Sequence, residues 1–462
     1  MPGKVWLFTA ASREPHRRLI RLAGMAQSSS GGSSFAHAAL NRIVRIDRSE
    51  VAASLWSFAC FFSLLCGYYV LRPLRDEMGV QGGVENLPWL FSATFAAMLG
   101  VAPLFGWAAA RLPRRRLVPW TYLFFIANVL VFYALFALGV APPAVARAFF
   151  VWVSVFNLFA VSLFWSFMAD LFRPEQAARL FGFLSAGGSC GALVGPTLTA
   201  LLAAPLGTAN LLLVSCGFLG LALLCITALI RGAGTGAPAG PVRPPAEPGD
   251  SIGGTAWSGI AEIARSPYLL GIVAYVLLYT VLLGFAYLEL ARMVSATYHD
   301  PAQRTALFAQ MDLAVNVITL LGQLLVVAKF VEKLGVGAAL ALLPALGLVG
   351  FAAIGFAPVL AVLIAFQILR RAADYAIARP AREMLFTVLT REAKYKSKNF
   401  IDTVVFRSGD AASGWVYAAL KSLGLGLAGL AAAAIPGVIL WLVLGLWLGR
   451  QYARKSSSGP GR

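Results

Sequence analysis

The chain has 462 residues, of which 59% are hydrophobic and 13% are charged, and its mean hydropathy is +0.76. A soluble domain needs far less apolar surface, so the composition indicates an integral membrane protein that is embedded in a lipid bilayer. The net charge of +18 would by itself suggest nucleic acid. However, most lysines and arginines fall on segments predicted to share one side of the membrane, as the positive-inside rule requires. We therefore expect no nucleic-acid partner.

The sequence offers little that suggests an enzyme. Its five cysteines lie in apolar runs without a C-x-x-C pair, and its three histidines are scattered, so we expect neither disulfides nor a metal site. No G-x-x-x-x-G-K-[ST] loop is present, which argues against ATP hydrolysis by a P-loop. We predict that the protein is not an enzyme and needs no cofactor.

In chain order, residues 1–50 are basic and rich in Ser and Gly, which predicts a disordered cytoplasmic tail whose true start is Met1 or Met25. Residues 51–230 form the first predicted unit, the Pro- and Gly-rich stretch 231–266 a flexible cytoplasmic linker, 267–449 the second unit, and 450–462 a cytoplasmic tail. Apolar spans in the first unit are expected at Val51–Leu71, Leu87–Ala110, Leu117–Leu138, Ala144–Met168, Leu180–Ala203 and Ala209–Ile230. Those in the second are expected at Tyr268–Ala291, Ala306–Ala328, Val336–Phe356, Pro358–Ala378, Asn399–Leu420 and Gly424–Leu448.

This layout predicts an all-α membrane protein with twelve transmembrane helices in two pseudo-symmetric six-helix halves. The sequences 71–75 (LRPLR) and 288–292 (LELAR) occupy equivalent depths near the predicted outer mouth of spans one and seven, which favours an internal duplication. We expect a monomer in a bacterial inner membrane, with both termini in the cytoplasm.

Charged residues in the tenth span are the first functional signal. Arg370 and Arg371 fall a little past the predicted midplane, where an ionised side chain must face water or a partner. The spacing of Arg371, Asp374, Tyr375, Ala378 and Arg382 would place them on one face of an α-helix. A polar stripe of this kind predicts the wall of an aqueous path, with Arg371 and Tyr375 as substrate ligands.

Two motifs resemble those of the major facilitator superfamily. The loop from Gly106 to Arg116, which includes Arg111 and Arg115, resembles G-x-x-x-D-R-x-G-R-R, although Ala110 and Pro113 replace the usual Asp and Gly. In span five, the residues Gly182, Gly191, Gly195 and Pro196 match the antiporter motif G-x8-G-x3-G-P. The resemblance implies the major facilitator fold, in which two halves rock about a central cavity and move a small solute by alternating access.

A narrower resemblance is to the ATP/ADP translocase-type nucleotide transporters. Residues 68–76 (YYVLRPLRD) are similar to Y-x-x-L-R-x-x-K-D, and 375–384 (YAIARPAREM) to Y-A-x-x-x-P-x-K-E-M. The lysines at 394, 396 and 398, followed by Asp402 and Arg407-x-Gly409, are similar to that family's K-x-K-x-K, D and R-x-G. The resemblance implies exchange of a nucleotide or similar anion, and as substrate-binding residues it implies Arg72, Arg75, Glu289, Arg382, Glu383, Asp402 and Arg407. Asp410 departs from the family, which has Lys there, and could pair with Arg407.

Other functions stay open at this stage. Several carboxylates, Asp76, Asp312, Asp374 and Asp410 together with Glu289, lie at membrane depth and are candidate proton carriers. They suit a proton-coupled antiporter that exports drugs or metabolites. The second solute that is moved along with the substrate is therefore a proton in this alternative, and a counter-substrate in nucleotide exchange. Arg72 and Arg75 could instead reach the outer interface as ordinary snorkelling side chains. A transport-inactive membrane scaffold is the remaining alternative.

Overall fold

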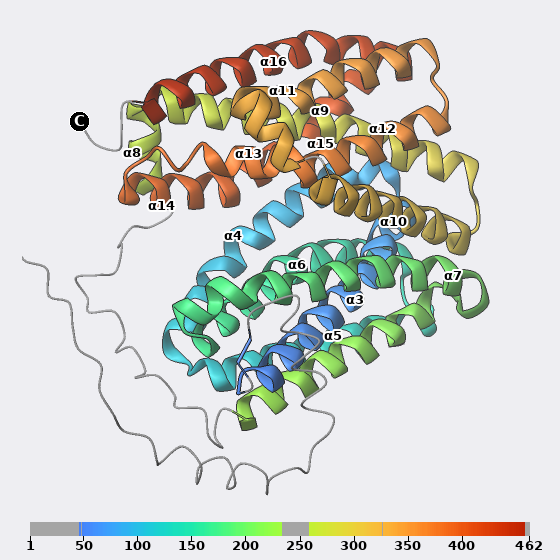
Figure 1. Cartoon of the computed structure of the whole chain (residues 1–462). Helices are drawn as coiled ribbons and strands as arrows, with labels where there is room; N and C mark the ends of the chain where they lie inside the picture. Colours follow the sequence, from blue (N-terminus) through green and yellow to red (C-terminus); the bar gives the residue numbers. More distant parts are fainter. Residues whose placement is uncertain (1–45, 48, 233–257, 326, 458–462) are drawn as a thin grey trace, which may run out of the picture.

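The computed structural model of the protein describes residues 46–47, 49–232, 258–325 and 327–457, and all regular structure in these ranges is helical (Figure 1). The first elements are α3 (Val51–Gln81), the 3-10 turn η1 (Val84–Asn86), α4 (Leu87–Arg111), α5 (Arg114–Ala137), α6 (Pro142–Leu171) and α7 (Pro174–Gly232). They are followed by α8 (Ser258–Arg265), α9 (Pro267–Thr297), α10 (Pro301–Leu325), α11 (Val327–Phe356) and α12 (Leu360–Ala373). The chain ends with the π turn η2 (Asp374–Ala378), α13 (Arg379–Met384), α14 (Arg391–Phe400), the π turn η3 (Ile401–Val405), α15 (Phe406–Ser422) and α16 (Leu427–Ser457).

Nine helices in this described part of the chain are long and apolar enough to cross a membrane. One of them, the 59-residue α7, turns at Gly207, whose φ of 76° is a left-handed value that glycine adopts without strain. This turn lies between the predicted spans Leu180–Ala203 and Ala209–Ile230. The predicted spans Pro358–Ala378 and Asn399–Leu420 correspond to shorter, charged helices that the two π turns interrupt.

The first and seventh predicted spans end too early. Helix α3 continues past Leu71 to Gln81, and α9 continues past Ala291 to Thr297. In α3 the charged residues beyond Leu71 find partners inside the protein, as in the pairs of Arg75 with Asp76 and Glu77 with Arg304. In α9, Arg292 is 55% exposed and pairs with Glu289 of the same helix. Pro73 lies within α3 without ending it.

The boundaries of the predicted tails and linker also shift. Most of 1–50 and residues 233–257 and 458–462 lie outside the described residues, but Glu50 is buried against α7 and 258–265 form α8. Helix α8 is amphipathic and buries Ile263, so the end of the predicted linker is helical. The predicted carboxyl-terminal tail begins inside α16, which reaches Ser457.

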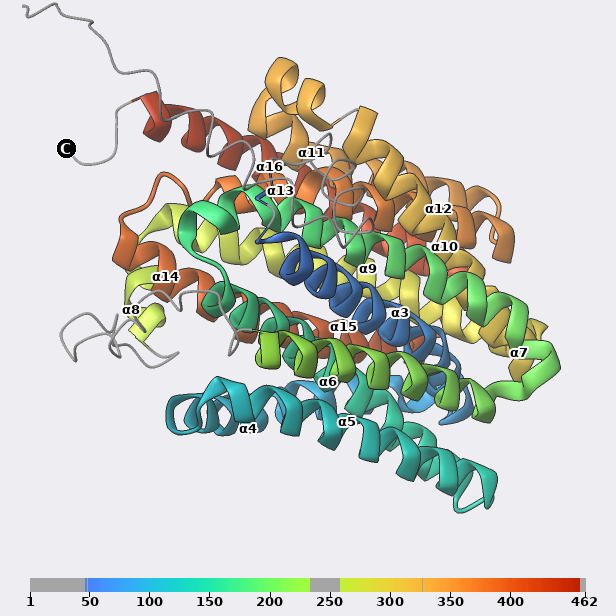
Figure 2. The ribbon, with the colours of Figure 1, turned by 60° about the horizontal axis from the view of Figure 1, so that its bottom comes forward.

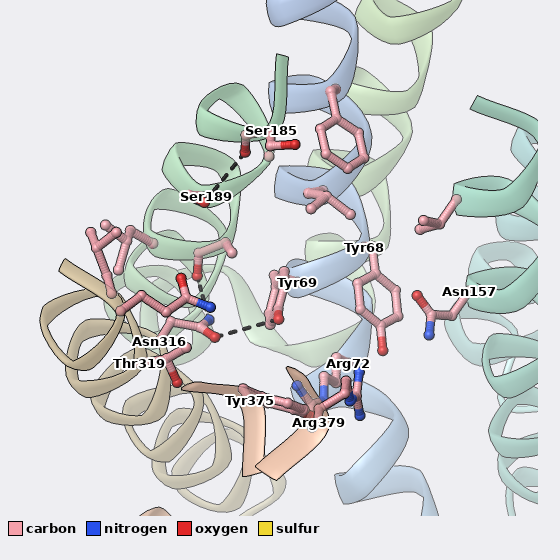
Figure 3. A pocket seen from close by; sticks show the side chains of 18 of the residues that line it. Tyr68, Tyr69, Arg72, Asn157, Ser185, Ser189, Asn316, Thr319, Tyr375 and Arg379 are labelled. Carbon is pink, nitrogen blue, oxygen red and sulfur yellow. Dashed lines mark hydrogen bonds between the residues drawn. The ribbon is translucent and has the colours of Figure 1, made fainter. Parts of the chain in front are cut away.

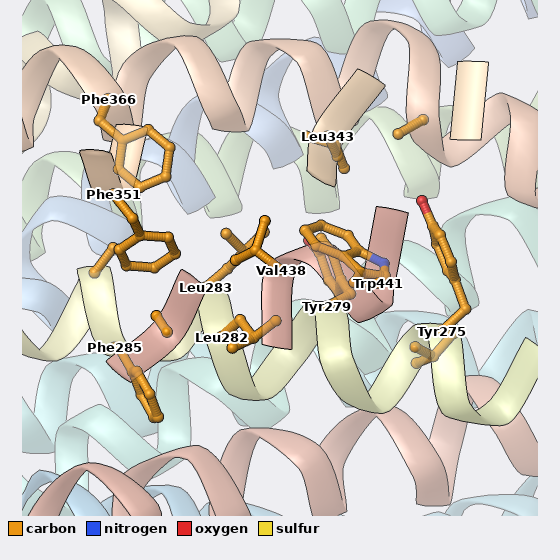
Figure 4. Close-up of a cluster of buried hydrophobic side chains, with 14 of the residues drawn as sticks. Tyr275, Tyr279, Leu282, Leu283, Phe285, Leu343, Phe351, Phe366, Val438 and Trp441 are labelled. Atoms are coloured by element: carbon orange, nitrogen blue, oxygen red, sulfur yellow. The ribbon is translucent and has the colours of Figure 1, made fainter. Parts of the chain in front are cut away.

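Buried apolar side chains gather in two clusters. One joins α3, α5, α6 and α7, and the other joins α9, α11, α12, α15 and α16. Figure 4 shows part of the second cluster, where Tyr279 of α9 lies beside Trp441 of α16, and Phe351 of α11 lies beside Phe366 of α12. The two groups of helices lie one above the other in Figure 1, and contacts of α10 with α3 and α7, and of α4 with α15, join them.

Helix α7 approaches α3 through a row of glycines, which include the predicted Gly191 and Gly195. A Cβ at Gly195 would lie 2.7 Å from the carbonyl oxygen of Cys66 and 2.8 Å from the Cβ of Tyr69. The predicted Gly182 differs, because open space surrounds the position of its Cβ. Pro196 follows Gly195 within the helix. The close packing holds α3, and hence Tyr69 and Arg72, at a fixed distance from α7.

Candidate functional site

A cavity of about 530 Å³ lies between α3, α6 and α7 on one side and α10, η2 and α13 on the other. Figure 3 shows Arg72, Tyr375 and Arg379 together at one end and Ser185 and Ser189 of α7 at the other. Along α3 the lining runs from Phe61 to Arg72, which corresponds to roughly 16 Å of helix. The cavity is therefore elongated, and its two ends differ in chemistry.

Arg72 and Arg379 are the charged residues that line this cavity, and no Asp or Glu belongs to its described lining. The remaining lining is aromatic or polar and uncharged: Phe61, Tyr68, Tyr69 and Tyr375, with Asn157, Ser162, Ser185, Ser189, Asn316, Thr319 and Gln323, beside small and aliphatic residues. Guanidinium groups present planar sets of donors that suit phosphate and carboxylate oxygens. The cavity thus suits a solute with an anionic end and an uncharged polar body.

One carboxylate holds two arginines at the Arg72 end of the cavity. This is the closed end, because the buried ion pair of Glu77 and Arg304 joins α3 to α10 beyond it. Asp312 of α10 is 1% exposed and accepts a hydrogen bond from Arg371 of α12. Its second oxygen lies 3.6 Å from Nε of Arg72, and Arg72 Nη2 donates to the hydroxyl of Tyr375 at 3.3 Å. The Nε of Arg371 is buried without a hydrogen-bond partner. The trio of Arg72, Arg371 and Asp312 therefore keeps one positive charge in excess.

A second carboxylate, Asp374, lies in η2, one turn after Arg371 of α12. Asp374 accepts a hydrogen bond of 3.0 Å from the Tyr279 hydroxyl and lies 3.6 Å from Nη2 of Arg379. Arg379 also stacks over the Tyr375 ring, with its guanidinium carbon 4.8 Å from the ring centre. Arg370 is 9% exposed, and its Nε donates to Gln367 at 2.8 Å. Arg370 is within electrostatic range of Asp374 but forms no ion pair with it.

The π turn η2 explains why the predicted polar stripe is wrong. A π turn closes i→i+5 hydrogen bonds, so it rotates the residues that follow it relative to an α-helix. Arg371 and Tyr375 face α3 and α10, whereas Asp374 faces Tyr279 of α9. Arg382 packs its guanidinium over the rings of Tyr279 and Phe406, each 5.9 Å away, and does not line the cavity.

A hydrogen-bonded chain connects α3, α10 and α7 beside the cavity. Tyr69 donates to Asn316 Oδ1 at 3.4 Å, and Asn316 Nδ2 donates to the carbonyl of Ala192 at 2.6 Å. Neither Tyr69 nor Asn316 was among the predicted site residues, and no spacing or motif marks them. Arg370 and Arg379 were not among the predicted site residues either. Their positive charges, close in sequence to Arg371 and Tyr375, could have indicated them.

Several predicted substrate ligands lie beyond the closed end. Arg75 is paired with Asp76 at 2.6 Å, and Asp76 accepts a 3.0 Å hydrogen bond from Tyr287 of α9. Arg407 and Asp410 are paired at 3.3 Å, as their spacing suggested. These four residues do not line the cavity. Their charges cancel in pairs.

The other predicted ligands lie elsewhere on the second group of helices. Glu289 accepts a hydrogen bond from Tyr417 and lies 3.4 Å from both Arg292 and Lys421. Glu383 is paired with Lys398, and Asp402 is exposed. Thus Glu289, Glu383 and Asp402 are not brought together with Arg72 in this state of the protein.

The predicted loop motif also lies apart from the cavity. Gly106 and Arg111 belong to the last turns of α4, and Arg115 begins α5 as an exposed side chain. None of the three lines the cavity.

Residues 51–373 match the family model of the Major Facilitator Superfamily. No curated protein matches the chain.

Solved structures similar in fold include a mutant of the nucleoside transporter NupG, with 11% identity over 87% of this chain and 99% of that chain and a TM-score of 0.62. A bacterial homologue of the iron transporter ferroportin has 14% identity over 87% and 98%, also with a TM-score of 0.62. The peptide transporter POT in complex with sulfate has 17% identity over 90% and 100%, with a TM-score of 0.57. At these identities the likeness is one of fold.

Proposed function

The chain belongs to the Major Facilitator Superfamily and is a transporter rather than an enzyme, and we propose that it moves a small organic anion across the membrane by secondary transport. The observation that carries this proposal is the cavity lined by Arg72 and Arg379, with no lining carboxylate among the described residues. An arginine at membrane depth is expensive unless it serves a partner or a passenger. Here the two guanidinium groups face open space that an anion can fill.

A nucleotide is the leading candidate within this class. The motifs around Arg72 and Tyr375 resemble those of the ATP/ADP translocase-type transporters, and both of these residues line the cavity. The aromatic rings of Tyr68 and Tyr69 line the cavity, and a planar base can stack against such rings. We therefore include exchange of one nucleotide for another in the proposal, with a counter-substrate as the second partner.

The proposal includes an architecture of twelve passages in two six-helix halves. This count is obtained if α7 crosses twice, before and after Gly207, and if α12–α13 and α14–α15 each cross once. The excess of basic residues on the connections shared with both chain ends supports termini in the cytoplasm and an inner membrane as part of the proposal. We propose that a single chain suffices, because the cavity is formed within it.

Uptake of labelled nucleotides and sugar phosphates into proteoliposomes tests the function. We expect Arg72→Gln and Arg379→Gln each to lower uptake by about 10- to 100-fold, since each removes a charge-assisted contact of about 1.5–3 kcal/mol. Arg115→Gln is the matched control, because Arg115 is exposed on α5 and lies apart from the cavity. It should leave uptake unchanged.

Anion transport is contradicted if uptake of all these solutes persists in the Arg72→Gln/Arg379→Gln double variant. The same assay distinguishes the predicted ligands that line the cavity from those that are paired elsewhere. We expect Arg75→Gln and Arg407→Gln to act mainly on stability, because each arginine is already paired with a neighbouring carboxylate.

Proton-coupled efflux of a drug or metabolite is the alternative. It is favoured by the burial of Asp312 and Asp374 beside the cavity, since such carboxylates can carry protons. This alternative expects a pH-dependent rate that is lost in Asp312→Asn, together with drug sensitivity when the protein is deleted. An exchange rate that depends on the counter-substrate but not on a proton gradient would exclude it.

A further inference from the structure

We propose that the substrate is a dianion whose two charges lie on one end group, as in a phosphate monoester with an uncharged polar body. This inference rests on the proposed transport of organic anions and specifies their charge. It is drawn from the balance of ionised groups around the cavity and from their position at one end of it.

The arginines next to the cavity outnumber the carboxylates by two. Arg72 and Arg371 share Asp312, Arg379 pairs with Asp374, and Arg370, four residues before Asp374, is within electrostatic range of it. Each arginine counts as one positive charge in this balance, and each aspartate as one negative charge. Each group of three therefore carries one unit of positive charge.

Most ionised groups around these two trios are paired. A further positive excess, where Glu289 lies 3.4 Å from both Arg292 and Lys421, is apart from the cavity. Towards the closed end, Arg75 pairs with Asp76, Arg407 with Asp410, and Arg304 with Glu77. Near α14, Lys398 pairs with Glu383, and Arg382 has Asp402 within electrostatic range. The excess of two positive charges is thus located around the cavity itself.

A charge excess of this size matters most when the cavity closes. In the open state water solvates Arg379, whose side chain is 48% exposed. Closure removes that water, and a charge without a counter-ion is then strongly unfavourable in a low-dielectric surrounding. A dianion neutralises both units, whereas a monoanion or a neutral solute leaves one or two uncompensated.

The distribution of lining groups places both substrate charges on the same end. Arg72, Arg379 and the hydroxyl of Tyr375 meet at the closed end. The other end presents the hydroxyls of Ser185 and Ser189, and Asn157 lies between them and Arg72 (Figure 3). A dicarboxylate with charges at both ends would leave one carboxylate among uncharged groups. A phosphate monoester places two charges on one group and leaves its body for the hydroxyls and the amide.

A charge series with a common body tests the inference. The purified full chain in lipid nanodiscs is titrated with adenosine, cyclic AMP, AMP, ADP and ATP, which carry from none to four negative charges near pH 7.5. Ribose 5-phosphate and glucose 6-phosphate test whether the body can vary. In the absence of magnesium, we expect the monoesters to bind at least about tenfold more tightly than cyclic AMP, ADP or ATP.

Two variants change the excess in opposite directions without altering the two arginines that line the cavity. Arg370→Gln lowers the excess to one and should shift the preference from AMP towards cyclic AMP. Asp374→Asn raises it to three and should shift the preference towards ADP. The double variant Arg370→Gln/Asp374→Asn restores an excess of two and should again prefer AMP, and melting curves establish that each variant is folded.

The outcomes separate this inference from the proposed function. If no anion binds, the organic-anion function itself fails. If anions bind but ADP or ATP binds as well as AMP, or if the preference is the same in all folded variants, the dianion assignment is overturned while anion transport stands. If a single variant does not fold, the charge series on the wild type and the remaining variants still decides.

Discussion

Glu50 is a single carboxylate that fastens the start of α3 to α7. It is 6% exposed, and its Oε1 accepts hydrogen bonds from Gln176 at 2.7 Å and Arg179 at 3.0 Å. Its Oε2 accepts the backbone N–H of Asp47 at 3.1 Å. Burial acts to raise the pKa of Glu50, but these hydrogen bonds and the Arg179 charge outweigh it and hold the pKa below its usual value.

We predict that Glu50→Gln destabilises the protein by about 1–2 kcal/mol at neutral pH, because it removes a charge-assisted contact. A folded-state pKa below the unfolded value means that the stabilisation is complete above the unfolded pKa of about 4.3 and is lost as the pH falls through the folded pKa. Melting temperatures of wild type and variant, measured from pH 7 to pH 3, should therefore converge at the acidic end. A constant difference across that range would contradict the assignment.

Individual site residues could be predicted only near charged side chains that fall inside an apolar span, or within a recognised motif. Arg371 and Tyr375 were found from their position in an apolar span, and Arg72 from a motif. Arg72 lies at the closed end of the cavity because α3 continues beyond it to Gln81. Tyr69 and Asn316 are ordinary residues in a membrane helix. Their role depends on which side chains meet across α3, α10 and α7, and one sequence does not reveal that.

At the scale of the elements, the contact between α3 and α7 depends on glycines whose positions leave no room for a Cβ atom. We predict that Gly195→Ala lowers stability by about 1–3 kcal/mol, because its Cβ would meet the Cys66 carbonyl oxygen at 2.7 Å and force the helices apart. The control is Gly182→Ala in the same helix, where the added Cβ meets nothing within 4 Å. That variant should gain about 0.5–1 kcal/mol, since alanine favours the helix. Thermal melting in detergent checks both signs, and a loss of stability in both variants would argue against the close contact.

The broken helices show the limit of reasoning from periodicity. The helical character of nearly every predicted span is confirmed, because apolar length alone requires a helix in lipid. The register within the tenth span could not be predicted, since the five residues of η2 look like any α-helical segment. This turn rotates the residues that follow it and leaves Arg382 against Phe406, away from Arg371.

At the scale of the whole molecule, polar contacts between the two groups of helices cluster at and beyond Arg72. Arg304 of α10 donates to both oxygens of Glu77 of α3 at 2.6 and 2.7 Å, and Glu77 is fully buried. Trp415 of α15 donates to Ser92 of α4 at 3.0 Å. The cavity extends from Arg72 towards the start of α3, and these contacts lie on the other side of Arg72. They therefore close the cavity at its Arg72 end.

We predict that Glu77→Gln destabilises this closed end by about 3–5 kcal/mol, because it leaves the buried Arg304 without a counter-ion. Glu77→Gln/Arg304→Gln should recover part of the loss, since neither charge then needs a partner. Melting curves measure the stability. Labelling of Thr305→Cys, introduced in a cysteine-free background at a position that is 0% exposed, should become faster in Glu77→Gln.

The control for this labelling is Arg292→Gln, which removes a side chain that is 55% exposed. Equal labelling of Thr305→Cys in the wild type, Glu77→Gln and Arg292→Gln backgrounds would show that the Glu77–Arg304 pair does not keep that end shut.

Sharing one aspartate between two arginines has an electrical consequence. A carrier that returned empty would drag surplus positive charge through the bilayer, against or along the membrane voltage, whereas a carrier loaded with a matching anion would move as a neutral body. Such a protein would exchange one substrate for another in a tightly coupled cycle, and its turnover rate would not depend on the membrane potential.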